Sequence, residues 1–174
     1  MLPGKLTKLR SYHQDDLATL TLLLNDEETR SQTIQNLIPP YTEAMVHKRF
    51  EQDLDANHFY YLIENYSDQI IGVLELDSLF KDRHCQISLQ IIASQLDKGY
   101  GSDALKLILD RIFLEMNMNK CTTIIPSFNK AAEVILTQAG FKKEVVMRDH
   151  VFRNGSYHDA LIFGLLQEEF IASV

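Results

Sequence analysis

The residues best suited to chemistry in this chain form a glycine loop between an alternating apolar strand and a long amphipathic helix. The loop reads Gln95-Leu96-Asp97-Lys98-Gly99-Tyr100-Gly101-Ser102. Two glycines flank a single residue, so few side chains cover the backbone N–H groups that point toward the free end of the helix. Helix N-termini of this kind bind phosphates. The loop therefore predicts a phosphorylated ligand.

One class of phosphorylated ligand is a dinucleotide, because Gly99, Gly101 and Ala104 satisfy the G-x-G-x-x-G/A fingerprint. That interpretation also requires a parallel sheet and an acidic residue about 20 positions further on, at the end of the next strand. Between residues 116 and 138 the one carboxylate is Glu133, which lies inside a predicted helix. A NAD-type dinucleotide-binding protein therefore stays a remote alternative.

The length and composition predict one domain over residues 1–174, with 45% hydrophobic residues. A chain of this length buries about 70% of the surface of its unfolded form. No apolar run approaches the ~18 residues of a membrane span, and the start Met1-Leu2-Pro3-Gly4-Lys5 lacks the apolar stretch of a signal peptide. We therefore expect a cytoplasmic protein with no membrane partner.

Charge and cysteine content limit the class of partner further. The net charge is −7 and the pI is about 5.3, which disfavours a nucleic-acid surface and favours positively charged partners. Cys85 and Cys121 have neither the spacing of a metal site nor a nearby histidine pair. Buried free thiols and no metal are expected.

The elements that must position the loop follow from periodicity and from turn residues. In order, they are a strand, two helices, three antiparallel strands, a helix, a strand, a helix and a hairpin. The expected strands cover 5–10, 58–64, 69–77, 86–92 and 120–126. The expected helices are one that is capped by Asp15 or Asp16 and runs through Leu24, and those over 42–54, 100–116 and 129–139, the last of which Gly140 ends. The expected hairpin turns at Asn154-Gly155.

This order, with the glycine loop opening the third long helix, resembles the GNAT superfamily of acetyl-CoA-dependent N-acetyltransferases over nearly the whole chain. Asn129-Lys130-Ala131-Ala132 followed by Ala139-Gly140-Phe141 is similar to the N-x-x-S … G-F stretch of the family. Residues 151–157 with Asp159 look like the hairpin of one branch, which contains ribosomal-protein N-terminal acetyltransferases and bacterial spermidine N-acetyltransferases.

The resemblance implies an α/β (α+β) fold, the GNAT acyl-CoA N-acyltransferase fold. Its central sheet is mixed and mostly antiparallel, with six to seven strands flanked by about four helices. The implied cosubstrate is acetyl-CoA, with no metal, and a homodimer is compatible with the family.

The resemblance also implies where coenzyme A binds. Its pyrophosphate is expected over the helix N-terminus at 98–102, and its pantetheine arm along the strand at 91–93. Lys130 adds positive charge nearby, and Asn129 is either a cofactor contact or simply a helix cap. The expected cofactor-binding residues are Ile91, Ile92, Ala93, Lys98, Gly99, Tyr100, Gly101, Ser102 and Asn129.

Several proton-transfer groups of the family pattern are replaced in this chain. Leu96 stands where a Gln or Arg leads the glycine motif, Ala132 replaces a serine, Leu136 replaces the tyrosine that serves as general acid, and Gln86 replaces a glutamate. A thiol with a pKa of about 8.5 leaves tolerably as thiolate, so losing the acid should cost about 1–2 kcal/mol. Activity is expected to survive.

The candidate catalytic residue is Glu75, in the strand 70–77, which matches a glutamate of the polyamine branch and would act as a base through a water molecule. The alternative is an ordinary solvated strand carboxylate. Asp77 and His84 are weaker candidates for the same role.

The stretch 25–28 and Tyr41 fall where helices of the family that this chain resembles form a wall of the acceptor site. Because 25–28 is acidic, the amine acceptor is expected to be cationic. An α-amine with a pKa of about 8 loses its proton readily, whereas an amine of pKa 10.4 needs about 4 kcal/mol at pH 7.5. A site with few bases therefore favours a protein N-terminal α-amine over a polyamine or other small amine. Direct attack in a ternary complex is expected, and a catalytically silent acyl-CoA-binding or sensing protein is the alternative.

Overall fold

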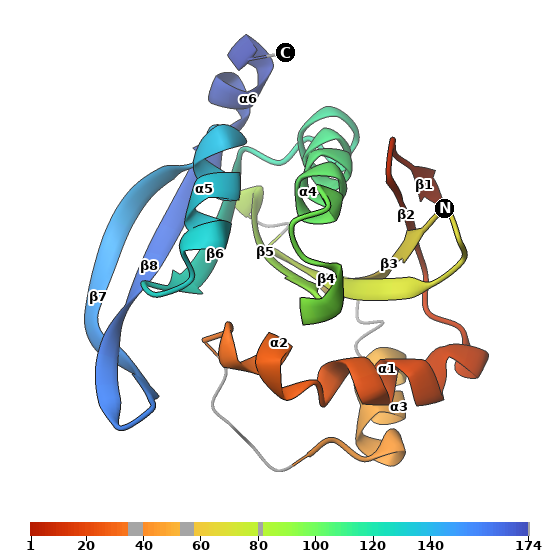
Figure 1. Ribbon diagram of the computed structural model, residues 1–174. Coiled ribbons are helices and arrows are strands. Elements are labelled where there is room, and N and C mark those ends of the chain that lie inside the picture. Colours follow the sequence, from red (N-terminus) through yellow and green to blue (C-terminus); the bar gives the residue numbers. More distant parts are fainter. Residues whose placement is uncertain (35–39, 53–57, 80–81, 174) are drawn as a thin grey trace.

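The sheet is the centre of the molecule, and the described part of the chain contributes eight strands to it in the order β1-β2-β3-β4-β5-β6-β8-β7 (Figure 1). The computed structural model describes residues 1–34, 40–52, 58–79 and 82–173. Its strands are β1 (Leu2–Pro3), β2 (Thr7–Arg10), β3 (His58–Asn65), β4 (Ile70–Leu79), β5 (His84–Ile91), β6 (Lys120–Pro126), β7 (Lys142–Arg153) and β8 (Ser156–Leu166).

The helices surround this sheet. They are α1 (Leu17–Leu24), α2 (Glu27–Ser31), α3 (Glu43–Gln52), α4 (Tyr100–Asp110), α5 (Lys130–Gln138) and α6 (Gln167–Ser173), with short 3₁₀ helices η1 (Gln14–Asp16) and η3 (Ala93–Gln95) and a π-helical turn η4 (Arg111–Glu115). The predicted order of elements and the predicted mixed, mostly antiparallel sheet are confirmed, but the described residues form eight strands where six to seven were expected. The described residues add β1, α2 and α6 to the expected elements, all too short for a recognisable hydrophobic period.

Two hydrophobic cores lie on opposite faces of the sheet because strand residues alternate between its faces. Leu62 of β3 and Val73 of β4 pack against α1 and α3. Their neighbours Ile63 and Leu74 pack in the other core, against α4. Figure 1 shows this division, with α1, α2 and α3 on one side of the sheet and α4 and α5 on the other.

Strands β5 and β6 form the one parallel pair among the described strands. Their pairing covers 84–86 against 120–122 and then stops, although both strands continue. The strands therefore splay apart and open the sheet at its middle. A dinucleotide-binding fold requires a parallel sheet, so that alternative is wrong.

Cys85 and Cys121 face each other where the parallel pairing holds. Both are free and fully buried, as expected, and burial raises the pKa of the Cys121 thiol. Within the described ranges, no three His, Cys, Asp or Glu side chains group as metal ligands would. A search of the same residues finds no helix of the length and apolarity that a membrane span requires.

Candidate active site

The glycine loop opens α4 without a side-chain cap from any described residue. Gly99 takes the N-cap position with φ of +81°, a left-handed conformation that glycine adopts without strain. A Cβ built on Gly101 would lie 3.6 Å from Ile135 and 3.8 Å from Ile91. The loop therefore sits directly over the end of β5 and beside α5, with the first N–H groups of α4 uncapped.

Asp103 anchors this helix end to the chain between β1 and β2. Its carboxylate accepts hydrogen bonds from the backbone N–H groups of Lys5, Leu6 and Thr7 at 2.9–3.1 Å, and from the Thr7 hydroxyl at 2.7 Å. Burial acts to raise the pKa of Asp103, but these hydrogen bonds outweigh it and lower the pKa below its usual value. The first turn of α4 is thus held in place from outside the helix.

Two of the expected cofactor contacts already have partners within the chain. The amide of Asn129 caps α5 by accepting from the Ala132 N–H at 3.0 Å and donates to the Gln32 carbonyl at 3.0 Å. The Lys98 ammonium is exposed and lies 2.8 Å from Oε1 of Gln95. Asn129 therefore has a structural role in this fold, whatever else it contacts.

The backbone N–H groups of β5 and of the residues that follow it point in different directions, and some of them have partners within the chain. The Ile92 N–H donates to the Ile71 carbonyl at 2.9 Å, and the Ala93 N–H donates to Oγ1 of Thr29 at 2.9 Å. Because backbone groups alternate along a strand, the N–H groups of Ile91 and Leu89 point away from β4, toward the gap beside β6. Since β5 pairs with β6 only over 84–86, no described strand pairs with these two donors, and a ligand in the gap could accept from them.

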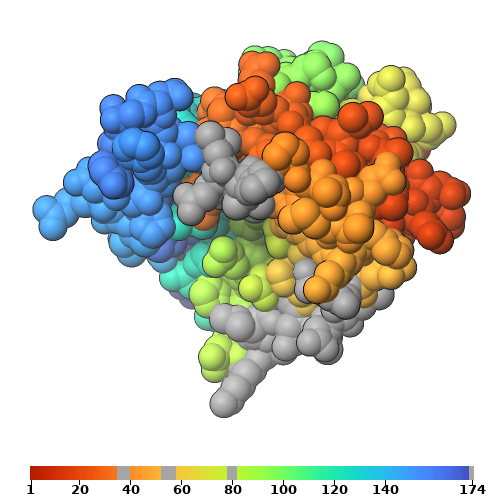
Figure 2. Space-filling view, turned by 90° about the horizontal axis from the view of Figure 1, so that it is seen from below, coloured from red at the N-terminus to blue at the C-terminus, as the bar shows by residue number. Residues whose placement is uncertain are grey.

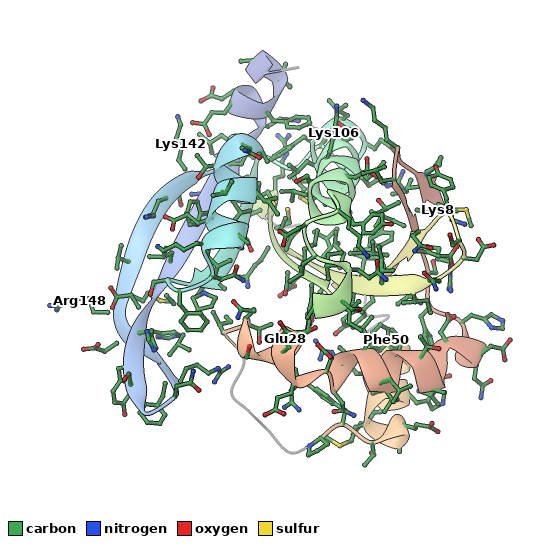
Figure 3. The ribbon with its side chains drawn as sticks, viewed as in Figure 1. Lys8, Glu28, Phe50, Lys106, Lys142 and Arg148 are labelled. Atoms are coloured by element: carbon green, nitrogen blue, oxygen red, sulfur yellow. The ribbon has the colours of Figure 1, made fainter. Side chains whose placement is uncertain are left out.

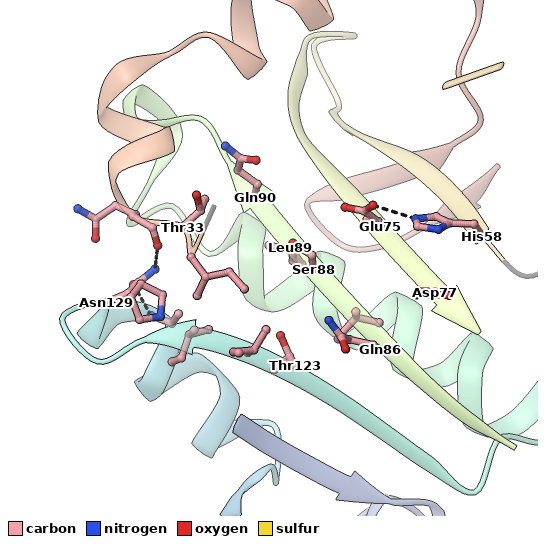
Figure 4. A pocket seen from close by; sticks show the side chains of 17 residues that line it. Thr33, His58, Glu75, Asp77, Gln86, Ser88, Leu89, Gln90, Thr123 and Asn129 are labelled. Atoms are coloured by element: carbon pink, nitrogen blue, oxygen red, sulfur yellow. Dashed lines mark hydrogen bonds and ion pairs between the residues drawn. The ribbon is translucent and has the colours of Figure 1, made fainter. Parts of the chain in front are cut away.

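A cavity of about 220 Å³ occupies the gap and reaches both faces of the sheet (Figure 4). Asn129 and Ala132 of α5 line it on one face, and Glu75 of β4 lines it on the other. Ser88 of β5 and Thr123 of β6 lie between them. The cavity thus runs from α5 on one face of the sheet to a carboxylate on the other. The N-terminus of α4 does not line it but adjoins it, since a Cβ built on Gly101 would lie 3.9 Å from the lining residue Leu89.

Glu75 is held by three side chains, and 21% of its own side chain is exposed. Oε1 lies 2.8 Å from Nε2 of His58 and accepts from the Tyr60 hydroxyl at 3.1 Å, while Oε2 accepts from Arg49 at 3.1 Å. Burial acts to lower the pKa of Arg49, but the charge of Glu75 and the Tyr60 hydroxyl raise it above the ordinary value. The predicted catalytic residue therefore lies in the cavity as part of a charged cluster.

Of the two weaker candidates for the catalytic residue, Asp77 lines the cavity and His84 does not. Asp77 is exposed and lines the cavity two residues from Glu75, opposite Gln86 and His58 in the sheet register. His84 does not line it, and its Nε2 lies 3.0 Å from Oγ1 of Thr122.

The side chain of Asn25 links the two segments that are expected to form a wall of the acceptor site, 25–28 and Tyr41. Asn25 donates to the Tyr41 carbonyl at 2.8 Å and accepts from the Tyr41 N–H at 2.7 Å. Asp26 caps the short helix α2, and Glu27 and Glu28 lie exposed in its first turn. In Figure 2, which views the face of α1–α3, yellow-green atoms of the β4–β5 region reach the surface between the orange α3 and the blue β7–β8 hairpin.

His58, Tyr60 and Arg49 were missed by sequence reasoning. They come from two elements that precede Glu75 by 15 to 26 residues. Their signal is the alternation of His58 and Tyr60 in a strand that pairs with the Glu75 strand. That signal becomes readable only when the register of the pair is known.

Comparison with known proteins gives three findings. Residues 9–162 match the acetyltransferase (GNAT) domain family. The chain is 26% identical to the SPbeta prophage-derived uncharacterized N-acetyltransferase YokL of Bacillus subtilis (96% of this chain, 93% of that protein), and 23% identical to spermidine N(1)-acetyltransferase of Escherichia coli K12 (95% and 88%). The solved structure of spermidine N-acetyltransferase from Vibrio cholerae in complex with CoA and spermine superposes with a TM-score of 0.86 at 21% identity, covering 95% of this chain and 98% of that one.

Proposed function

This chain belongs to the acetyltransferase (GNAT) family and is an N-acetyltransferase that uses acetyl-CoA, and we propose that its acceptor is a cationic primary amine that enters from the α1–α3 face. The observation that carries the proposal is the cavity through the sheet. It extends from Leu89, which adjoins Gly101 at the α4 N-terminus, to Glu75, so a donor that reaches into it from α4 could meet an amine beside Glu75. Direct attack in a ternary complex requires such a space.

The described residues fit coenzyme A. We propose that the uncapped N–H groups at Gly99, Tyr100, Gly101 and Ser102 bind the pyrophosphate, helped by the positive end of the α4 dipole. Lys98 adds a positive charge close to them. Bound acetyl-CoA supplies the acetyl group as an activated thioester.

The strand residues would hold the arm of coenzyme A and its reacting group. The Leu89 and Ile91 N–H groups are free to donate to amides of the arm or to polarise the thioester carbonyl, with Ile92 and Ala93 as apolar contacts. Asn129 is placed beside the same cavity. These residues bind and orient the donor and need no metal.

On the opposite face we propose Glu75 as the catalytic carboxylate, on which removal of the amine proton depends. It lies in the strand next to β5, opposite Ser88. Asp77 lines the same end of the cavity and attracts the ammonium form of the acceptor. The amine thus meets negative charge before it reaches the thioester.

The charges in the cavity favour an α-amine. Arg49 offsets Glu75, so among the described lining residues Asp77 is the carboxylate without a cationic partner. One such carboxylate matches one ammonium group better than a polycation. An α-amine also reaches its neutral, nucleophilic form more easily than a polyamine nitrogen. A peptide N-terminus is therefore the first candidate acceptor.

Spermidine or a related polyamine is the second candidate. Two of the similar proteins are named spermidine acetyltransferases and match this chain nearly end to end. Glu27 and Glu28, exposed at the start of α2, are available for further positive charges of such an acceptor.

Acetyl-CoA-dependent thiol release against a panel of amines separates the candidates. The panel contains basic N-terminal peptides, the same peptides with a blocked α-amine, spermidine, free amino acids and aminoglycosides. Release with peptides that stops on blocking supports the α-amine. Preferred release with spermidine would transfer the assignment to polyamines, and release with neither class would contradict the proposed acceptor.

A further inference from the structure

The ring of His58 is held in one orientation at the acceptor end of the cavity, and the inference drawn from it rests on the acceptor site proposed above. Nε2 lies 2.8 Å from Oε1 of Glu75, and the ring stacks on Tyr60 with centroids 5.0 Å apart and planes 24° apart. The side chain is 28% exposed and lines the cavity (Figure 4). An imidazole is therefore fixed beside the space where an amine would lie.

Glu75 has little freedom to bind the amine proton itself. Its Oε1 already faces Tyr60 and His58, and its Oε2 faces Arg49. A carboxylate has about four acceptor positions, and these side chains take three of those of Glu75. Glu75 is therefore mainly an acceptor for the groups that hold it.

The ionised carboxylate selects the tautomer of the neutral ring. Nε2 must carry the hydrogen that Glu75 accepts, which leaves the lone pair of Nδ1 open. Among the described residues, none forms a hydrogen bond or ion pair with Nδ1 of His58. We infer that His58 is the catalytic base, that Nδ1 takes the proton of the amine, and that Glu75 positions the ring and stabilises the imidazolium. Carboxylate–histidine pairs in other enzymes divide the work in the same way.

The proton and electron balance of the step is simple. The neutral amine nitrogen forms a bond to the acetyl carbon, its N–H bond breaks, and the proton passes to Nδ1. The carbon–sulfur bond breaks with its electron pair on sulfur, which takes a proton from water, and the imidazolium returns its proton to water. An imidazole is better matched to this task at neutral pH than a carboxylate.

The charged and titratable groups that face His58 come from each neighbouring element. Glu75 and Asp77 face it from β4, Tyr60 lies on β3 itself, and Arg49 reaches the cluster from α3. Two carboxylates and one guanidinium thus surround the ring, and the guanidinium contacts Glu75.

The test compares His58→Gln with the matched control His84→Gln in the whole protein, with any amine that the wild type acetylates. The glutamine amide can still donate to Glu75 but cannot take a proton. We expect kcat/KM to fall about 100-fold in His58→Gln, with loss of the acidic limb of its pH profile. The control should stay within about threefold of the wild type, because His84 lies outside the cavity. Added imidazole should restore part of the activity of His58→Ala.

Acetyl-CoA binding and far-ultraviolet circular dichroism show whether each variant is folded. Activity of His58→Gln within threefold of the wild type would overturn the inference, and so would an unchanged acidic limb or an equal loss in His84→Gln. The acceptor proposal is tested by which amines the wild type uses, whereas the base is tested by the ratio of variant to wild type. The two proposals therefore fail separately.

Discussion

The two ends of the proposed site, the α4 N-terminus and the charged cluster of β3 and β4, are built from different parts of the chain. At the α4 end the groups offered to a ligand are backbone N–H groups, those of the first turn of the helix and those of Leu89 and Ile91. At the β3–β4 end they are ionisable side chains, with Glu75 and His58 at the centre (Figure 3 shows how densely side chains fill both sides of the sheet). On the proposed assignment, backbone geometry determines cofactor binding at the first end, and side-chain chemistry determines reactivity at the second.

The contrast predicts that substitutions at the two ends have different effects. A change in the glycine loop should act on acetyl-CoA affinity, whereas a change in the charged cluster should act on turnover. A residue that affects both equally would contradict this division.

The largest effect is expected for Gly101→Glu. The new carboxylate would lie among the N–H groups proposed for the pyrophosphate, so repulsion and lost space should weaken acetyl-CoA binding at least about 100-fold, measured by calorimetry. Gly101→Ala is the matched control, because a Cβ there would meet its neighbours at the ordinary distances of 3.6–3.9 Å. Unchanged binding by the folded Gly101→Glu protein would contradict the assigned cofactor site.

Glu75→Gln should have the next largest effect, and it should act on turnover instead of acetyl-CoA affinity. We expect kcat to fall about 100-fold, because the ring of His58 loses the carboxylate that sets its tautomer. The affinity for acetyl-CoA should stay within about threefold of the wild type. A variant that turns over normally, or one that loses acetyl-CoA instead, would show that Glu75 does not belong to the reactive end.

Asp103→Asn tests the anchor of the α4 end through stability. Losing the charged hydrogen bonds should lower the free energy of unfolding by about 1–3 kcal/mol at pH 7 in denaturant titrations. The pKa of Asp103 is lowered in the folded protein, so its stabilisation is complete above its unfolded pKa of about 3.9 and disappears as pH falls through the folded value. The difference between wild type and variant should therefore shrink in acid, and a constant difference would contradict the account.

The smallest effects are expected at Asn129. Removing the cap in Asn129→Ala should cost about 1 kcal/mol of stability, whereas Asn129→Ser keeps a capping oxygen and should lose less. If the amide also contacts coenzyme A, both variants should weaken acetyl-CoA binding by a factor of a few. Wild-type affinity in both would leave Asn129 with its structural role alone.

Local sequence signals predicted the conformations of helix ends and of the hairpin turn well. Gly99 adopts the left-handed conformation that the glycine motif required, and Gly140 ends α5 with φ of +93°. Asn154 and Gly155 both have positive φ, which is the conformation expected of a two-residue hairpin turn. Each of these conformations depends on a few consecutive residues, so each could be predicted without the tertiary structure.

The reactive end could be predicted only in part. Glu75 was a candidate from the sequence, and its catalytic role stays a prediction. His58, Tyr60 and Arg49 were not candidates, because only the β3–β4 register and the packing of α3 bring them to Glu75. The acidic stretch 25–28 predicted a wall of the acceptor site and also contains the start of the short helix α2. Side chains that meet across strands and helices leave no spacing pattern in one sequence.

Hydrogen exchange with and without acetyl-CoA tests most directly the claim that the donor lies in the gap between β5 and β6. We predict slower exchange of the Leu89 and Ile91 N–H groups and of residues 99–102 when acetyl-CoA is added. Unchanged exchange at Leu89 and Ile91, or slowing confined to the separate cavity beside Arg10 and Gln69, would contradict it.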